Sequence, residues 1–120
     1  MEAESVSVLE LTLFKHSEAT FLLALDEAGI KHSRIAMFST APQASGLKEV
    51  ISAVSDAMPW NAIAKVMVAW VEARNSREII ITTEDGKIFH AKGYSAAEIK
   101  ELIPKSHSAM IIDAKPDEES

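Results

Sequence analysis

The sequence predicts a single domain of the α+β class, in which a small mixed sheet of four or five strands packs with helices in the order β-α-β-α-α-β-β-α. Three observations predict it. Apolar and polar residues alternate along residues 5–14, as in a half-buried strand. Apolar residues recur at helical spacing in several later segments. Asp85-Gly86, between two strand-like runs, is a strong hairpin signal.

The first half of the chain predicts a strand, a helix and a second strand. In 5–14, Leu9, Leu11 and Leu13 alternate with polar residues. A helix is expected over 17–29, with Ser17 as its cap. The segment 32–40 is apolar on both parities, which suits a strand covered on both faces. The composition of 41–46 predicts a loop.

Two consecutive helices are expected in the middle of the chain. In 46–58 the apolar residues recur at helical spacing, at Leu47, Val50, Ile51, Val54 and Met58. Pro59 interrupts this pattern and is suited to the first turn of a new helix. The following segment, 60–75, is apolar nearly all round. Such a helix is packed on several sides or meets a partner.

A hairpin with strands over 77–84 and 87–92 follows. A two-residue turn at Asp85-Gly86 would place Ile81 opposite His90. The expected core face is therefore composed of Ile79, Ile81, Thr83, Ile88, His90 and Lys92. On the other face, Ile80 and Phe89 would form an exposed apolar spot.

The chain is expected to finish with a helix, a short strand and a tail. Ser95 and Glu98 match a capping box for a helix over 94–103, which Pro104 ends. The segment 108–113 is expected to be a short edge strand. The globular domain is expected to span 1–112, and the acidic segment 113–120 to be a disordered tail.

Composition restricts the function classes. The 120 residues contain no cysteine, which excludes disulfides, thiol nucleophiles and Cys-based metal sites. Of the net charge of −6, residues 2 and 4 contribute two negative charges and residues 113–120 a net three. The body is nearly neutral and has no basic stripe, which disfavours nucleic-acid binding. No apolar run is long enough to span a membrane, and a cytoplasmic protein is expected.

No residue pattern predicts a catalytic, cofactor or metal site. His16, His32, His90 and His107 lack the spacing of a metal motif, and the chain has no nucleophile elbow and no glycine-rich phosphate loop. No cofactor is therefore expected. The residues chosen instead as candidates for contact with another protein are Trp60, Arg74, Arg77, Ile80 and Phe89.

Four segments within residues 46–103 together form a family-like pattern: "GLKEVISAVSDAM", "IAKVMVAWVEARNSR", "EIIITTEDGKIFHAKG" and "SAAEIKELI". In these segments the chain resembles the effector-associated constant component family of bacterial conflict systems. The best-matched residues are Gly46, Leu47, Trp70, Arg74, Arg77, Asp85 and Gly86. The sequence departs from the family pattern at Val71, where leucine is usual, and at Glu72, in a segment otherwise rich in arginine.

The resemblance implies a non-enzymatic adaptor that acts through protein–protein contacts, as an accessory component of a bacterial defence or conflict system. Its partner would be an effector or toxin protein, and self-association as a homo-oligomer stays open. Partners of the nucleic-acid or membrane kind are not expected. Two alternatives remain: a small acidic immunity or inhibitor protein that blocks an enzyme or toxin, and a small enzyme.

Overall fold

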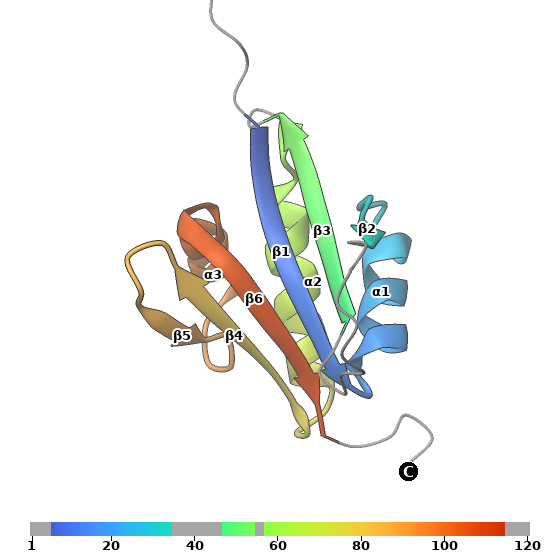
Figure 1. The fold of residues 1–120 in the computed structure, drawn as a ribbon. Helices are drawn as coiled ribbons and strands as arrows, with labels where there is room; N and C mark the ends of the chain where they lie inside the picture. Colours follow the sequence, from blue (N-terminus) through green and yellow to red (C-terminus); the bar gives the residue numbers. More distant parts are fainter. Residues whose placement is uncertain (1–5, 35–46, 55–56, 115–120) are drawn as a thin grey trace, which may run out of the picture.

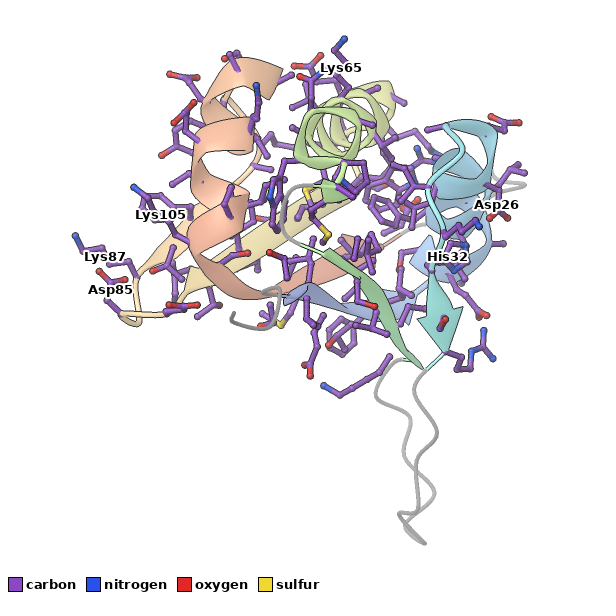
Figure 2. All side chains as sticks on the ribbon, turned by 90° about the horizontal axis from the view of Figure 1, so that it is seen from above. Asp26, His32, Lys65, Asp85, Lys87 and Lys105 are labelled. Carbon is purple, nitrogen blue, oxygen red and sulfur yellow. The ribbon has the colours of Figure 1, made fainter. Side chains whose placement is uncertain are left out.

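The chain folds into two layers, a six-stranded sheet and three helices on one of its faces (Figures 1 and 2). The structure is a computed structural model and describes residues 6–34, 47–54 and 57–114. The α+β class is confirmed, with six strands where four or five were expected. The elements are β1 (Val6–Lys15), α1 (Ser17–Glu27), β2 (Ser33–Arg34), β3 (Leu47–Val54), α2 (Trp60–Ala73), β4 (Arg77–Thr83), β5 (Ile88–His90), α3 (Ala96–Leu102), the 3₁₀ turn η2 (Ile103–Lys105) and β6 (Ser106–Asp113).

The sheet is mixed and has the strand order β2-β3-β1-β6-β4-β5. β1 pairs antiparallel with β3 on one side and parallel with β6 on the other. β4 pairs antiparallel with both β6 and β5. The two central strands of the sheet are therefore β1, near the beginning of the described residues, and β6, near their end.

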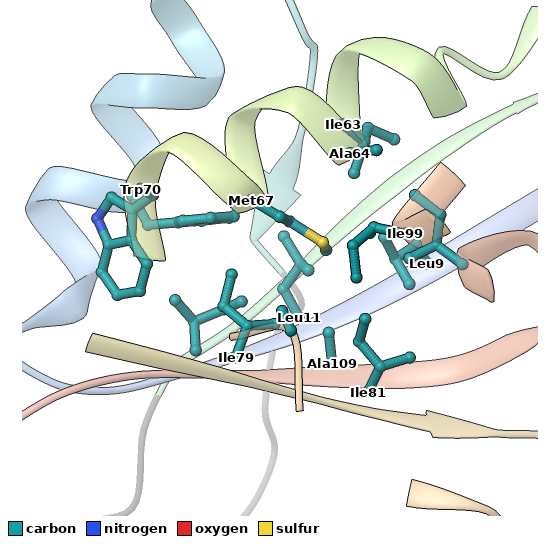
Figure 3. Packing of buried hydrophobic residues seen from close by; sticks show 14 of the residues in the cluster. Leu9, Leu11, Ile63, Ala64, Met67, Trp70, Ile79, Ile81, Ile99 and Ala109 are labelled. Carbon is teal, nitrogen blue, oxygen red and sulfur yellow. The ribbon is translucent and has the colours of Figure 1, made fainter. Parts of the chain in front are cut away.

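The core lies between the sheet and the helices. Leu9, Leu11 and Leu13 of β1 point toward the helices and are buried, as their alternation predicts. α2 lies across the sheet and places Ile63 and Met67 over it (Figure 3). The other buried apolar residues of this cluster come mainly from α1, β4, α3 and β6, and they include Phe21, Leu25, Ile79, Ile81, Ile99, Ala109 and Ile111.

Several local predictions are confirmed. Helices occupy 17–27 and 60–73, close to the expected spans. The Ser95 hydroxyl accepts a hydrogen bond from the Glu98 amide, and the Glu98 carboxylate accepts one from the Ser95 amide, which completes the capping box of α3. Of the strand expected over 32–40, the structure shows β2; the rest, and the loop expected over 41–46, lie outside the described residues.

The helix expected over 46–58 is wrong, because residues 47–54 form strand β3. All eight residues pair with β1, from Leu13 opposite Leu47 to Val6 opposite Val54. The sequence of β3 does not show the two-residue apolar period of a strand, because its buried inner face carries the charged Glu49 as well as the apolar Ile51. This carboxylate is buried among hydrogen-bond donors, and β-branched residues nearby favour a strand once a pairing partner is present.

The edge strand expected over 108–113 is also wrong in position. β6 lies in the interior of the sheet, between β1 and β4. Its last residue, Asp113, was expected to begin the disordered tail, but it is fully buried and belongs to the sheet. The buried carboxylate is tolerated because Arg77 pairs with it.

The hairpin has a different register from the expected one. The Thr83 amide donates to the Lys87 carbonyl, and the Gly86 amide donates to the Thr83 carbonyl. The connection therefore has three residues, with Gly86 at φ +89°. Phe89 consequently lies opposite Ile81, one residue away from the expected pairing.

This shift exchanges the two faces of β5. Ile88, expected in the core, is 62% exposed, and His90 is exposed as well. Phe89 takes the inner position and packs against the core and the Tyr94 ring. The assignment of Ile79, Ile81 and Thr83 on β4 to the inner face is correct.

Candidate interaction surface

The face of the sheet opposite the helices is covered by no helix or strand of the described residues (Figure 2). We call it the outer face. It is formed by alternate residues of five strands, all of them half-buried or exposed. These residues are Val8, Glu10, Thr12 and Phe14 of β1; Lys48, Val50 and Ser52 of β3; Ser108, Met110 and Ile112 of β6; Glu78, Ile80 and Thr82 of β4; and Ile88 and His90 of β5.

The centre of the outer face is apolar. Strand pairing places Met110 beside Ile80 and Ile112 beside Phe14, so four large side chains from three strands adjoin one another. Thr12 of β1 is the partner of Met110 in the neighbouring strand, and it adds only a small polar group to the centre. Solvent-facing sides of sheets usually carry polar residues, so this apolar centre distinguishes the outer face from an ordinary solvated sheet face.

Charged and titratable groups lie around this centre. The Lys48 ammonium donates to the Thr12 hydroxyl at 3.4 Å. On the other side, Glu78 and His90 share a hydrogen bond. With Glu10, the outer face carries two carboxylates, one lysine and one histidine. With histidine counted as neutral, two carboxylates against one lysine leave a single net negative charge, so the outer face is weakly charged.

The five candidate contact residues do not gather in one place. Ile80 lies on the outer face, and Phe89 lies on the opposite face because of the shifted register. Trp60 begins α2 and packs partly against the core. Arg74 is half-buried at the C-terminal cap of the same helix. Among these positions only Ile80 contributes to the outer face.

Arg77 is a buried structural residue in this chain. Its guanidinium donates from Nε to Asp113 Oδ2 at 2.9 Å and from Nη1 to the Trp70 carbonyl at 3.2 Å. The same group lies 4.6 Å from the centre of the Trp70 ring. Ser76 donates to the other oxygen of Asp113 at 2.7 Å. The expectation that Arg77 contacts a partner does not fit these surroundings.

Trp70 joins this network to the helix layer. Its indole N–H donates to the Thr20 hydroxyl at 3.0 Å, and its ring meets Phe21 edge-on with centroids 5.3 Å apart. Trp70 is therefore a core residue, with 4% of its surface exposed.

A second polar cluster surrounds His32, at the end of the sheet next to α1 (Figure 2). Its ring nitrogens contact Glu49 at 2.9 Å and Asp26 at 2.8 Å. Burial alone would lower the pKa of His32, but the hydrogen bonds and charges of Glu49 and Asp26 outweigh it and raise the pKa above 6.5. Arg34 binds the other oxygen of Glu49 at 3.0 Å and also Glu18 at 2.9 Å.

The hydrogen bonds of this cluster join α1, β2 and β3. Glu49 is 3% exposed. One oxygen of its carboxylate hydrogen-bonds His32 and the other accepts a hydrogen bond from Arg34. Across residues 6–34, 47–54 and 57–114, no group of three His, Cys, Asp or Glu side chains is arranged to hold a metal ion.

A pocket of about 400 Å³ lies at the hairpin turn, with Lys87, Lys105 and Asp85 at its rim and Phe89 and Leu102 among its lining (Figure 2). The Thr83 hydroxyl donates to the Asp85 carboxylate and lowers its pKa, together with the backbone and charge of Lys87. Asp85 therefore stabilises the turn as a carboxylate.

A groove of about 490 Å³ runs between α1 and α2 and is lined largely by alanines, with Glu27 and Lys65 among its other residues.

Within the described ranges, no helix is long and apolar enough to cross a bilayer.

Comparison of the chain with protein-family models, with curated proteins and with solved structures gave no match. The outer face is therefore identified as a candidate interaction surface from its geometry alone.

Phe14, Met110 and Ile112, three of the four central residues of the outer face, were missed as contact candidates. A signal for them exists in the sequence. Phe14 has the parity opposite to the leucines of β1, and Met110 and Ile112 alternate with the core residues Ala109 and Ile111. Strands that are apolar on both parities in a two-layer fold place one apolar set on the uncovered side.

Proposed function

We propose that this chain is a non-enzymatic protein–protein interaction domain whose contact surface is the outer face of its sheet. The observation that carries the proposal is the apolar centre formed by Phe14, Ile80, Met110 and Ile112, over which no described element packs. Contiguous apolar surface rimmed by polar groups is typical of a protein contact site.

The balance of charge supports the same function. The polar groups of the outer face are small hydroxyls, two carboxylates, one lysine and one histidine. With histidine counted as neutral, covering the face therefore buries only one net negative charge. By contrast, the titratable clusters around His32 and Arg77 are engaged in holding elements together.

The resemblance of residues 46–103 supports a biological setting for this domain. We place it as a cytoplasmic accessory adaptor of a bacterial defence or conflict system, with an effector or toxin protein as its partner. Genes for such effectors beside the gene for this chain would support the setting, and an unrelated operon would weigh against it.

Capture from the native host tests the contact surface. The bait would be the full chain carrying Ile80→Lys or Met110→Lys, which place a charge in the centre of the outer face. Leu23→Lys is the matched control, because Leu23 is 55% exposed on α1, in the other layer. Proteins retained by the wild type and by Leu23→Lys should be lost from both outer-face variants. Equal retention by all four baits would contradict the proposal.

A further inference from the structure

We propose that the outer face is covered by the outer face of a second copy of this chain, in a face-to-face homodimer. This inference rests on the proposed function that the outer face is a protein contact surface, and it names a second copy, in place of the effector or toxin, as the occupant of that face. It rests on the size, shape and charge of that surface.

The size of the outer face favours a broad, flat occupant. The five strands have between three and ten residues, on average about seven. With strands about 4.8 Å apart and about 3.3 Å per residue, they cover an area equivalent to roughly 24 Å by 23 Å. A single helix is about 10 Å wide and would cover less than half of this width. Two copies would bury a footprint of roughly 1,100 Å² in total, which is near the lower limit of specific interfaces.

The shape also favours another copy. Sheets twist with a fixed hand, and two sheets of similar twist pack face to face about 10 Å apart with strands inclined by about 30°. The outer face of a second copy has the same twist and the same extent. Its central apolar residues, with Met110 and Ile112 on the middle strand β6, would interdigitate with their equivalents.

The charges permit this self-pairing. Glu10 and Glu78 carry two negative charges and Lys48 carries one positive charge, and His90 hydrogen-bonds Glu78. Lys48 lies on β3 and the Glu78–His90 pair lies on β4 and β5, on opposite sides of the central strands. A twofold axis along β6 therefore brings the Lys48 side of one copy toward the Glu78 side of the other.

Sedimentation over a dilution series is the first measurement. We expect the full chain to move between 13.1 kDa and twice that mass, with a dissociation constant of about 1–100 μM, as for a small interface. Ile80→Lys and Met110→Lys should raise this constant at least about 30-fold, as for central contact residues. Leu23→Lys should leave it unchanged, and circular dichroism should show the same folded content in all variants.

Cysteine cross-linking then identifies the face. The chain contains no cysteine, so each single-cysteine variant is an unambiguous probe. Met110→Cys and Thr12→Cys should form covalent dimers with a short bis-maleimide, whereas Leu23→Cys should not. The yield should fall on dilution in step with the sedimentation result.

Two outcomes would overturn the inference. One is a chain that stays monomeric up to about 1 mM. The other is a dimer that Leu23→Lys disrupts while Ile80→Lys and Met110→Lys leave it intact. A monomer whose partner proteins are still lost with Ile80→Lys would refute only the second copy as occupant and leave the proposed function standing. A face-to-face dimer that retains no other protein would support the second copy as occupant and refute the proposed contact with an effector or toxin.

Discussion

At the scale of single residues, the most consequential contact is the buried pair of Arg77 and Asp113. The two are 36 positions apart and join β4 to the end of β6, and the Arg77 side chain also binds the last turns of α2 through Trp70. A buried ion pair adds little net stability, yet the loss of one member leaves the other charged and unpaired in the interior. Asp113 therefore stabilises the fold by neutralising the buried charge of Arg77, and it has no contact with solvent.

We expect Asp113→Ala to lower the free energy of unfolding by about 3–5 kcal/mol, because Arg77 would keep its charge without a carboxylate. Urea unfolding measures this value. Exposed Glu72→Ala is the control and should change it by less than about 0.5 kcal/mol. The double variant Arg77→Met/Asp113→Leu should be more stable than Asp113→Ala. A loss below about 1 kcal/mol in Asp113→Ala would show that the pair is not needed.

His32 gives the stability a dependence on pH. The pKa of His32 is raised in the folded chain, so folding favours its protonated form. The stabilisation is complete below the ordinary value of 6.5 and is lost as the pH rises through the folded-state pKa. The charges that face the ring are Asp26 from α1 and Glu49 from β3, and Arg34 and Glu18 complete the cluster.

The stability difference between wild type and His32→Gln should therefore be largest near pH 5.5 and shrink toward pH 8, values that bracket the histidine range. Thermal unfolding at several pH values measures it, and the subtraction cancels the other titrating groups. Lys31→Gln, at the exposed neighbouring position, should give a difference that does not change over this range. A wild-type advantage that grows with rising pH would contradict the sign.

At the scale of elements, β3 and the hairpin show what a segment's own pattern leaves undecided. The residues of β3 have apolar spacing compatible with a helix, and their pairing with β1 makes them a strand. In the hairpin, Asp85-Gly86 correctly marks the turn, but the loop is one residue longer than the shortest possible one. That single residue moves Phe89 into the core and Ile88 out of it.

Gly86 is the residue on which this loop depends, because its φ of +89° is accessible to glycine and costly for residues with a Cβ. We expect Gly86→Ala to destabilise the chain by about 1–2 kcal/mol in thermal or urea unfolding. A Cβ there would meet no atom within 4 Å, so the cost is one of backbone conformation. Gly86→Asn should cost less, since asparagine tolerates a positive φ. Equal stability of Ala and wild type would refute this loop geometry.

At the scale of the whole molecule, the described residues form a sheet with helices on one face and no helix or strand on the other (Figure 1). The strands β1 and β6, from opposite ends of the described chain, pair in parallel at its centre. The uncovered side is consequently assembled from five strands, and the candidate interaction surface exists only when all five are in register.

Hydrogen exchange tests this arrangement across the whole chain. Amides of β1 and β6 have neighbouring strands on both sides, so we expect their peptides to exchange most slowly. Peptides that cover β2 and β5, at the two edges, should exchange fastest among the strands. If the peptide over 106–113 exchanged as fast as that over 88–90, β6 would be an edge strand and the strand order would be wrong.

The sequence by itself determined the features that depend on near neighbours: the alternation of β1, the long apolar helix α2, the presence of a hairpin at Asp85-Gly86 and the capping box of α3. It also predicted the α+β class. Each of these follows from periodicity or from hydrogen bonds within a few residues.

Only the tertiary structure decided which strands pair, in which register, and which face of the sheet the described helices cover. Strand pairing joins residues far apart, and a shift of one residue exchanges the two faces of a strand. The sequence therefore predicts Ile80 as an apolar residue on the outer side of its strand. Met110 and Ile112 can be assigned to the same face only once the pairing of β6 with β4 is known. The contact surface is a property of that assembled sheet and of none of its strands alone.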